Sequence, residues 1–363
     1  MTRLLMDEVN LRILKEICSG TGLFINLSYL SRKLKKHRNT IKVRVNELLD
    51  SKIIDPPIFP FFRQYKAHPL LIIILADLPP TEDVLEWMRK DKHIFAAFKI
   101  RQGSFNTLLI QFQKDILNYQ LWREHLVTSG RIPPRDIRTP SEAHFYSNQL
   151  IVKYKPSEGI KVLRQHVEMG EKVILNGIQL TEMHVDILES VLKGEGIGIN
   201  ETVLARTLEM HKKTIRRRID IMLKEKTILE PVCRFHSFIV PPGCVLQITK
   251  VEIRKNKKDV LRFLKNDPHI PMAFHICEGR FNYLLFEVFY QTEDRVEWSS
   301  HLRERFIGAI GVTETIVLME KNTYHIDQQK VSLGSINDSI KALKHKKDDY
   351  FSVIEPDYLL FDE

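Results

Sequence analysis

The sequence predicts an α+β protein in which two winged-helix-like helix-turn-helix domains alternate with two ferredoxin-like βαββαβ domains. Two observations carry this prediction. A basic helical stretch at residues 37–54 recurs without a gap 174 positions later, at residues 211–228. After each copy, the hydrophobic pattern changes to strands and helices in the order β-α-β-β-α-β. We therefore expect two copies of one two-domain unit.

Each basic stretch has the pattern of an amphipathic helix with an apolar stripe and a cationic face. The stripe falls at i, i+4, i+7 and i+8 in both copies: Ile41, Val45, Leu48 and Leu49, then Ile215, Ile219, Met222 and Leu223. A buried stripe under a cationic, hydrogen-bonding face is typical of a helix that lies in the DNA major groove. The predicted DNA-binding residues are Arg38, Asn39, Thr40, Lys42, Val43 and Arg44 in the first copy, and Lys212, Lys213, Thr214, Arg216, Arg217 and Arg218 in the second.

Within this set, Lys42 and Arg216 share one register on the exposed face and are the candidates for contacts with base edges. Arg44 and Arg218 lie closer to the apolar stripe, so we expect them to hold a phosphate or to stabilise the fold.

Two shorter helices are expected before each basic helix, which is the order of a helix-turn-helix domain. Residues 5–19 carry a helix-start signal at Asp7, and Asn26 can cap the next helix after a glycine-containing break. Pro56 and Pro57 end the unit. The same residues, or similar ones, recur in the second copy, where Asn200 corresponds to Asn26.

The βαββαβ pattern begins with a strand at residues 70–78, followed by a helix at 81–90, strands at 94–100 and 107–113, and a helix at 115–127. It recurs at an offset of 176 and ends in a strand at 312–320. In the first copy, we expect the last strand only near 150–154. A linker helix at 157–169 and a short helix at 335–344, capped by Ser335, complete the pattern.

The expected domains are two helix-turn-helix domains, two ferredoxin-like domains, a linker and a tail. Their boundaries are 1–58 (helix-turn-helix 1), 59–155 (ferredoxin-like 1), 156–179 (linker helix), 180–232 (helix-turn-helix 2), 233–322 (ferredoxin-like 2) and 323–363 (tail).

Net charge, cysteine spacing and apolar content indicate which partners, cofactors and cellular location to expect. A formal net charge of +9 and a pI near 9.2 indicate a polyanionic partner, here double-stranded DNA. The four cysteines have no metal-ligand spacing and fit a reducing cytoplasm, where we expect the protein. The longest apolar run, residues 70–76, is far too short to span a membrane. The recurring histidines His93 and His269 lack a second ligand at i+3 or i+4 on the same element, so we expect no metal and no cofactor.

These motifs resemble the Lrp/AsnC family, the feast/famine transcriptional regulators of bacteria and archaea. The family's recognition helix has the pattern S-x-x-T-V-x-x-R-I-x-x-L, and residues 37–48 and 211–222 match its spacing. Both copies depart from it at two places. They have Lys35 and Glu209 where a glycine is usual in the turn, and His37 and His211 where serine caps the helix.

The resemblance also points to an effector site. The family carries a G-x-Y-D-Y-like turn between the middle strands of its βαββαβ domain, and similar turns occur here. Gly103, Asn106, Gly279 and Asn282 are therefore the candidate effector-binding residues, with an asparagine in place of the family's acid. A small-molecule effector and a homo-oligomer are left open.

The resemblance implies a sequence-specific DNA-binding transcriptional regulator. A nearer alternative is an architectural protein that coats DNA without sequence choice. A more distant one is an enzyme, because the sirohaem decarboxylases share the Lrp/AsnC architecture. That branch resembles a strand motif H-x-Y-x-R, of which this chain keeps His275 but has Cys277 and Gly279 at the other positions. We therefore expect the protein not to be an enzyme, and absorbance in the haem range would test this.

Covalent fusion of two units predicts an intramolecular pseudo-dimer, since tethering raises the effective concentration of the partner sheet to about the millimolar range. The two basic helices differ at equivalent positions of the repeat. Asn39, Val43 and Asn46 in the first copy correspond to Lys213, Arg217 and Asp220 in the second. A single chain is expected to bind an asymmetric site whose half-sites lie about one helical turn, or a small multiple of it, apart.

Overall fold

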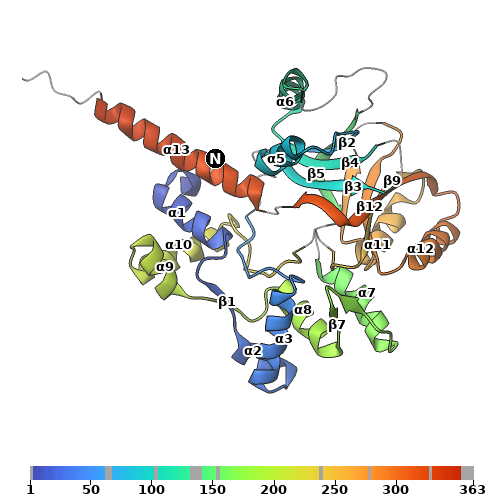
Figure 1. Ribbon diagram of the computed structural model, residues 1–363, viewed down its shortest axis with the longest axis horizontal. Helices are drawn as coiled ribbons and strands as arrows, with labels where there is room; N and C mark the ends of the chain where they lie inside the picture. Colours follow the sequence, from blue (N-terminus) through green and yellow to red (C-terminus); the bar gives the residue numbers. More distant parts are fainter. Residues whose placement is uncertain are drawn as a thin grey trace, which may run out of the picture.

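A computed structural model describes residues 3–61, 68–101, 105–130, 141–152, 156–236, 240–276, 279–326 and 329–352. The fold is α+β, with helix-turn-helix and ferredoxin-like units as the sequence predicts (Figure 1). The first half contains η1 (Arg3–Met6), α1 (Glu8–Cys18), β1 (Leu23–Ile25), α2 (Leu27–Leu34), α3 (Arg38–Asp50), β2 (Leu70–Ala76), α5 (Glu82–Lys90), β3 (Ile94–Ile100), β4 (Thr107–Gln113), α6 (Ile116–Thr128) and β5 (Ser141–Val152).

The second half repeats this order after a connecting helix, α7 (Pro156–Glu168), and a hairpin, β6 (Ile174–Leu175) and β7 (Ile178–Gln179). It contains α8 (Glu182–Leu192), β8 (Ile197–Ile199), α9 (Glu201–Leu208), α10 (Lys212–Lys224), β9 (Val245–Ile253), α11 (Lys257–Asn266), β10 (Met272–Ile276), β11 (Tyr283–Phe289), α12 (Thr292–Arg305), β12 (Ile310–Ile326) and α13 (Lys330–Ser352). None of the helices in the described ranges is long and apolar enough to cross a membrane.

The two βαββαβ units form one closed eight-stranded barrel, in the order β10-β11-β9-β12-β3-β4-β2-β5. Each unit has the antiparallel order of a ferredoxin-like sheet, with its first and third strands in the centre. The fourth strand of each unit pairs with the second strand of the other, β12 with β3 and β5 with β10. The expected pairing of the two sheets within one chain therefore closes the barrel and leaves it no free edge.

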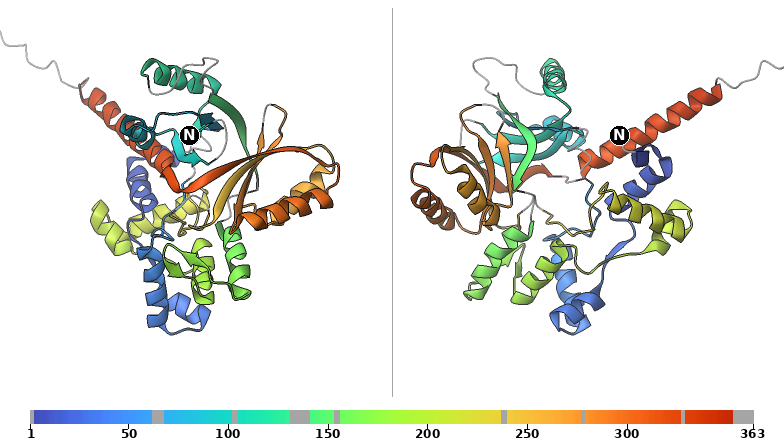
Figure 2. Two further views of the ribbon diagram at one scale, coloured as in Figure 1. Left: turned by 45° about the vertical axis from the view of Figure 1, so that its right-hand side comes forward. Right: turned by 180° about the vertical axis from the view of Figure 1, so that it is seen from behind.

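Alternating residues along the strands divide the apolar core between the inside and the outside of the barrel. On β2, Leu71 and Ile73 belong to the core inside the barrel, whereas Ile72 and Ile74 pack under α5 and α6 on the outside. The helices α11 and α12 cover the corresponding outer face of the second unit. The views in Figure 2 show these four helices around the strands.

The helix-turn-helix units exchange their first helices. The apolar face of α1 packs on α9 and α10 of the second copy, where Leu11 and Leu14 share a core with Leu204, Ile215 and Ile219. In the same way, α8 packs on α2 and α3 of the first copy. We call the group α8-α2-α3 reader 1 and the group α1-α9-α10 reader 2. The sequence predicted that three consecutive helices of each copy pack together in one helix-turn-helix domain. This part of the prediction is wrong, because the first helix of each domain comes from the other copy.

The exchange is possible because α1 and α8 carry the same apolar pattern and a crossing strand follows each of them. The two crossing strands, β1 and β8, pair antiparallel with Phe24 opposite Gly198, which are equivalent positions of the repeat. Farther along, the equivalent residues Ile58 and Val232 also face each other. These two self-paired positions mark a pseudo-two-fold axis between the readers. In Figure 1, β1 passes between the two groups of helices.

A helix follows the last strand of each βαββαβ unit and contacts the first helix of a reader. In reader 1, α7 packs on α8, and in reader 2, α13 packs on α1. The barrel and the readers are therefore connected by equivalent helices in both halves.

Two expected elements have different bounds in the structure. The last strand of the first unit begins at Ser141 and pairs with β2 over residues 141–147, so the expected start near residue 150 is wrong. The C-terminal helix runs from Lys330 to Ser352. Ser335 is consequently inside this helix, where its carbonyl accepts a hydrogen bond from Ser339 Oγ (2.8 Å), and is not its cap. Packing against α1 lengthens the helix beyond what local capping signals indicate.

Candidate nucleic-acid interface

The recognition helices α3 and α10 each bury the expected apolar stripe and expose the opposite face. Ile41, Val45 and Leu48 are buried in α3, and Ile215, Ile219 and Met222 are buried in α10. The following predicted DNA-binding residues are exposed: Arg38, Asn39, Thr40, Lys42 and Val43 on α3, and Lys212, Lys213, Thr214, Arg216 and Arg217 on α10. Arg44 and Arg218 are only partly exposed. The structure thus brings each predicted set together on one surface of its reader.

Both recognition helices begin in the same unusual way. His37 caps α3 through its Nδ1, which accepts a hydrogen bond from the backbone N–H of Asn39 (3.3 Å), and His211 caps α10 equivalently. In the preceding turn, Lys35 has φ +52° and Glu209 has φ +53°. This left-handed conformation costs a non-glycine residue about 1–2 kcal/mol. The turn therefore keeps the geometry for which the family resemblance expects glycine.

Arg44 and Arg218 hold the exchanged helices in place. The Nη1 of Arg218 donates to Asp7 Oδ1 (2.9 Å) and to Asn10 Oδ1 (2.6 Å) on α1. The Nη1 of Arg44 donates to Glu47 Oε2 (2.8 Å), which also accepts from Nε2 of His184 on α8 (2.9 Å). The two arginines occupy equivalent positions and connect each recognition helix to the first helix that the other copy supplies.

His184 is buried and uncharged at neutral pH. Burial lowers its pKa, and the nearby Arg44 lowers it further, against the opposing effect of Glu47. Its Nδ1 accepts from the backbone N–H of Thr181 (3.1 Å), so the ring proton must lie on Nε2, which faces Glu47. Hydrogen bonds from Arg44 and then from His184 lower the pKa of the Glu47 carboxyl.

The two candidates for base contacts differ in their surroundings. Arg216 is ion-paired with Glu201 (3.0 Å) and with Asp220 (3.1 Å). In the described part of the chain, no carboxylate lies within ion-pair distance of Lys42, because Leu27 and Asn46 occupy the positions equivalent to the two acids. Arg216 would have to exchange these partners to bind an external anion, whereas Lys42 is exposed without them. A hollow of about 610 Å³ runs along this face of α10.

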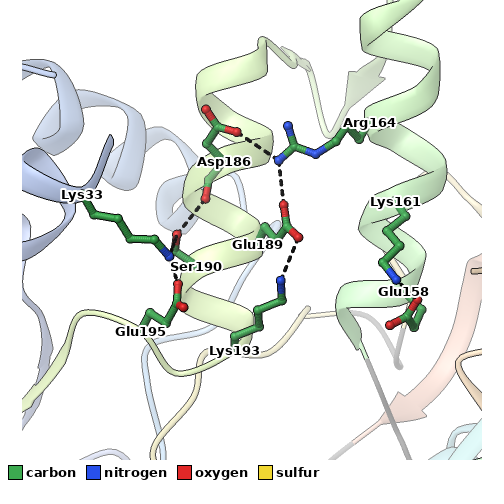
Figure 3. Close-up of polar contacts among 9 residues, drawn as sticks. All are labelled: Lys33, Glu158, Lys161, Arg164, Asp186, Glu189, Ser190, Lys193 and Glu195. Carbon is green, nitrogen blue, oxygen red and sulfur yellow. Dashed lines mark hydrogen bonds and ion pairs between the residues drawn. The ribbon is translucent and has the colours of Figure 1, made fainter. Parts of the chain in front are cut away.

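A polar network attaches α8 to its neighbours (Figure 3). Arg164 on α7 contacts Asp186 (2.9 Å) and Glu189 (2.7 Å) on α8. On the other side, Lys33 of α2 pairs with Glu195 just after α8. Reader 1 is held to α7 by these charged groups together with an apolar core, in which the buried Ile160 and Leu163 of α7 belong to the same cluster as residues of α8. Reader 2 is held to α13 by an apolar core that includes the buried Ile336.

The candidate effector residues are engaged with the backbone. Asn106 donates to the carbonyl of Leu78 (2.8 Å) and accepts from its N–H (2.9 Å), and Asn282 makes the same pair of bonds with Ile253. Gly279 has φ +94° with open space around it. Gly103 lies outside the described residues. Both asparagines therefore fix the loop after the first strand of their unit, which explains why this residue recurs in the two turns.

Sequence reasoning missed the residues that cross between the copies. Asp7 was recognised as a helix-start signal, but its bond to Arg218 joins residues from opposite copies. His184 had no signal of its own, although a histidine at the third position of a helix can satisfy a backbone donor as a capping glutamate does.

The fold of this chain is similar to that of several solved structures. No protein-family model and no curated protein matches the chain. Among solved structures, the siroheme decarboxylase NirDL is similar over 94% of this chain and 100% of its own, at 10% identity and a TM-score of 0.49. A transcriptional regulator of Neisseria meningitidis, in complex with L-Met, covers 38% of this chain and 88% of its own at 17% identity and a TM-score of 0.28.

An AsnC family transcriptional regulator from Agrobacterium tumefaciens covers 40% of this chain and 89% of its own, at 15% identity and a TM-score of 0.27. The similar structures therefore include both regulators and an enzyme. The expectation that the protein is not an enzyme is contradicted, because the solved structures similar to this chain include an enzyme, the siroheme decarboxylase NirDL. The fold gives no ground for excluding catalysis. Of the H-x-Y-x-R positions, Cys277 lies outside the described residues.

Proposed function

We propose that the chain is a sequence-specific DNA-binding transcriptional regulator of the Lrp/AsnC type that acts as an intramolecular pseudo-dimer on double-stranded DNA. The observation that carries the proposal is the pair of exposed cationic faces on α3 and α10, each above a buried apolar stripe. Cationic side chains on such a face can contact phosphates and base edges together. The domain boundaries given above are part of this proposal as ranges of the repeat, with the first helix of each helix-turn-helix range packed on the other two helices of the other copy.

On their cationic faces, the two recognition helices differ in character at one pair of equivalent, exposed positions. Val43 on α3 has an exposed fraction of 55%, which is unusual for an apolar side chain beside so many cations. Its counterpart on α10 is Arg217. An apolar side chain in the major groove suits a thymine methyl group, whereas arginine suits the O6 and N7 atoms of guanine. We therefore propose an asymmetric DNA site, with one half-site for each reader.

Selection of binding sites from random duplex DNA tests this proposal. The unmodified chain should enrich an asymmetric sequence, V43R should change the preferred bases in one half-site, and R217V should change those in the other. R89A is the matched control, since it removes an exposed cation that is ion-paired with Glu82 on α5, away from both readers. Enrichment of a perfect palindrome, or an unchanged preference in both variants, would contradict the asymmetric site.

Salt dependence separates specific binding from a purely architectural role. If about six to eight cations contact phosphates, the slope of log K against log salt should be about −5 to −7. A slope near zero would exclude this binding mode altogether. R216A should weaken binding to the selected site by about 1–3 kcal/mol, and less on random DNA. Equal losses on both would favour an architectural protein that coats DNA.

A further inference from the structure

A groove of about 750 Å³ lies between α5 and α6, on the outer face of the first βαββαβ unit and away from both recognition helices. Two tryptophans, Trp87 from α5 and Trp122 from α6, line it together with the carboxylates of Asp83, Glu86 and Asp91. The groove therefore combines large aromatic rings with negative charge.

The two tryptophans are held in fixed positions. Their ring centroids are 6.0 Å apart with an interplanar angle of 38°. Both indole N–H groups donate to the same oxygen of Asp91, at 3.2 Å from Trp87 and 2.7 Å from Trp122. The other oxygen of Asp91 accepts from the backbone N–H of His93 (2.8 Å). An aromatic wall whose polar atoms are already paired is organised before any ligand binds.

The equivalent groove of the second unit, about 520 Å³ between α11 and α12, contains its own cation. The guanidinium carbon of Arg305 lies 5.0 Å from the ring centroid of Phe263 and 5.8 Å from that of Phe306. Phe263 is the counterpart of Trp87, and a tryptophan, Trp298, again donates to the central carboxylate, here Asp267 (2.7 Å). A guanidinium on aromatic rings beside a carboxylate is a favourable arrangement.

Among the residues that the structure describes, the first unit has the same kind of wall without the guanidinium. Ser129 stands where the second unit has Arg305, and Gly130 stands where it has Phe306. The described lining of the first groove contains three carboxylates and a single Lys or Arg side chain, Lys90, which is ion-paired with Glu86. In the second groove, Asp259 and Asp267 are balanced by Arg262 and Arg305.

From this difference we propose that the groove between α5 and α6 binds a small organic cation, with a guanidinium or alkylammonium group placed where the second unit holds its own Arg305. The planar guanidinium fits best, because it can stack on an indole ring while it donates to a carboxylate. This binding does not depend on the DNA-binding function, and it is measured without DNA.

Tryptophan fluorescence and isothermal titration calorimetry of the full chain test the proposal. Two of the three tryptophans line the groove, so methylguanidinium and agmatine should change the emission saturably, whereas the neutral isostere methylurea should not. N-acetylarginine amide represents an arginine side chain of a protein, and tighter binding of agmatine is expected for a free small molecule. Tighter binding of the arginine amide, or equal responses to methylguanidinium and methylurea, would overturn the proposal.

Two substitutions exchange the character of the grooves. S129R should supply the first groove with its own guanidinium and weaken agmatine binding at least about tenfold. The matched control is T128R, which adds the same charge one residue earlier, on the side of α6 that faces Arg123 and Gln120. R305S should open the second groove and raise the stoichiometry from one agmatine to two. Equal effects of S129R and T128R, in variants whose circular dichroism matches that of the unmodified chain, would contradict the site.

Discussion

The two halves of the molecule share a backbone plan but differ in the polar residues that they place at equivalent positions. Reader 1 holds its exchanged helix through His184, Glu47 and Arg44, whereas reader 2 uses Asn10, Asp7 and Arg218. One linkage contains a titratable imidazole and the other does not. The two halves therefore keep the same packing positions while their charged groups differ.

The same divergence occurs beneath the outer helices of the barrel. In the second unit, Glu287 is buried between the sheet and α12, with Arg295 Nε 3.8 Å from its carboxylate. The equivalent positions of the first unit hold Gln111 and Tyr119, which are neutral and also buried. The second unit therefore has two ionisable side chains where the first unit has two neutral ones, and its stability should depend on pH in a way that the first unit's does not.

The largest expected effect comes from the position where the two halves meet. A Cβ atom at Gly198 would lie 2.5 Å from Cζ of Phe24, so the crossing strands accept one phenylalanine and one glycine at the pseudo-two-fold axis. G198F should lower the free energy of unfolding by about 3 kcal/mol, because two rings cannot share this space. Urea denaturation measures the change. The double variant F24G/G198F places the ring on the other strand and should recover most of the loss; no recovery would show that the pair does not act as a unit.

The next effect concerns Glu287. Burial raises the pKa of its carboxyl to about 7, well above the usual 4.5. Below about pH 4.5 the carboxyl is protonated in both the folded and the unfolded state, and its contribution to stability is fully present. As the pH rises to 7 and beyond, the unfolded chain loses the proton first, so the free energy of unfolding should fall by about 2.5 kcal/mol between pH 5 and pH 8.

The variant E287Q recreates the residue of the first unit and should remove this part of the pH dependence. Urea denaturation at pH 5 and pH 8 measures it, and E293Q, which changes an exposed carboxylate on the same helix, is the control. An unchanged difference between the two pH values in E287Q would mean that another group causes it.

The smallest effect concerns His184, whose pKa is lowered chiefly by burial. The sign is opposite to that of Glu287. Above about pH 6.5 the imidazole is neutral in both states, and as the pH falls the unfolded chain takes up a proton first. Acidification should therefore weaken reader 1 selectively. H184N supplies the residue that reader 2 has at this position and should flatten the decline, while H301N, on the exposed face of α12, should not.

Hydrogen exchange of α3 and α10 between pH 7.5 and pH 5.5 can follow the two readers separately. Intrinsic amide exchange slows as the pH falls, so the protection factors are compared, and a loss of protection in α3 alone is expected on acidification. An equal loss of protection in both helices would contradict a local role for His184.

Sequence alone determined the repeat, most of the elements and several of the helix caps. The period of apolar residues changes from helical to strand-like at the right places, and Asp7, Asn26 and Asn200 accept the capping hydrogen bonds that their positions indicate. The cationic faces of α3 and α10 could be predicted in the same way. The spacing of residues along one helix decides which side chains share its exposed face and which share its buried stripe.

Only the tertiary structure decided which helices belong together. The apolar stripes of α1 and α8 are chemically alike, so either could complete either reader, and the choice depends on the paired crossing strands between Phe24 and Gly198. The ion pair of Arg216 with Glu201 and the contact of Arg305 with Phe263 also join residues from separate helices. Local spacing carries no information about such contacts, because they depend on where the chain returns in space.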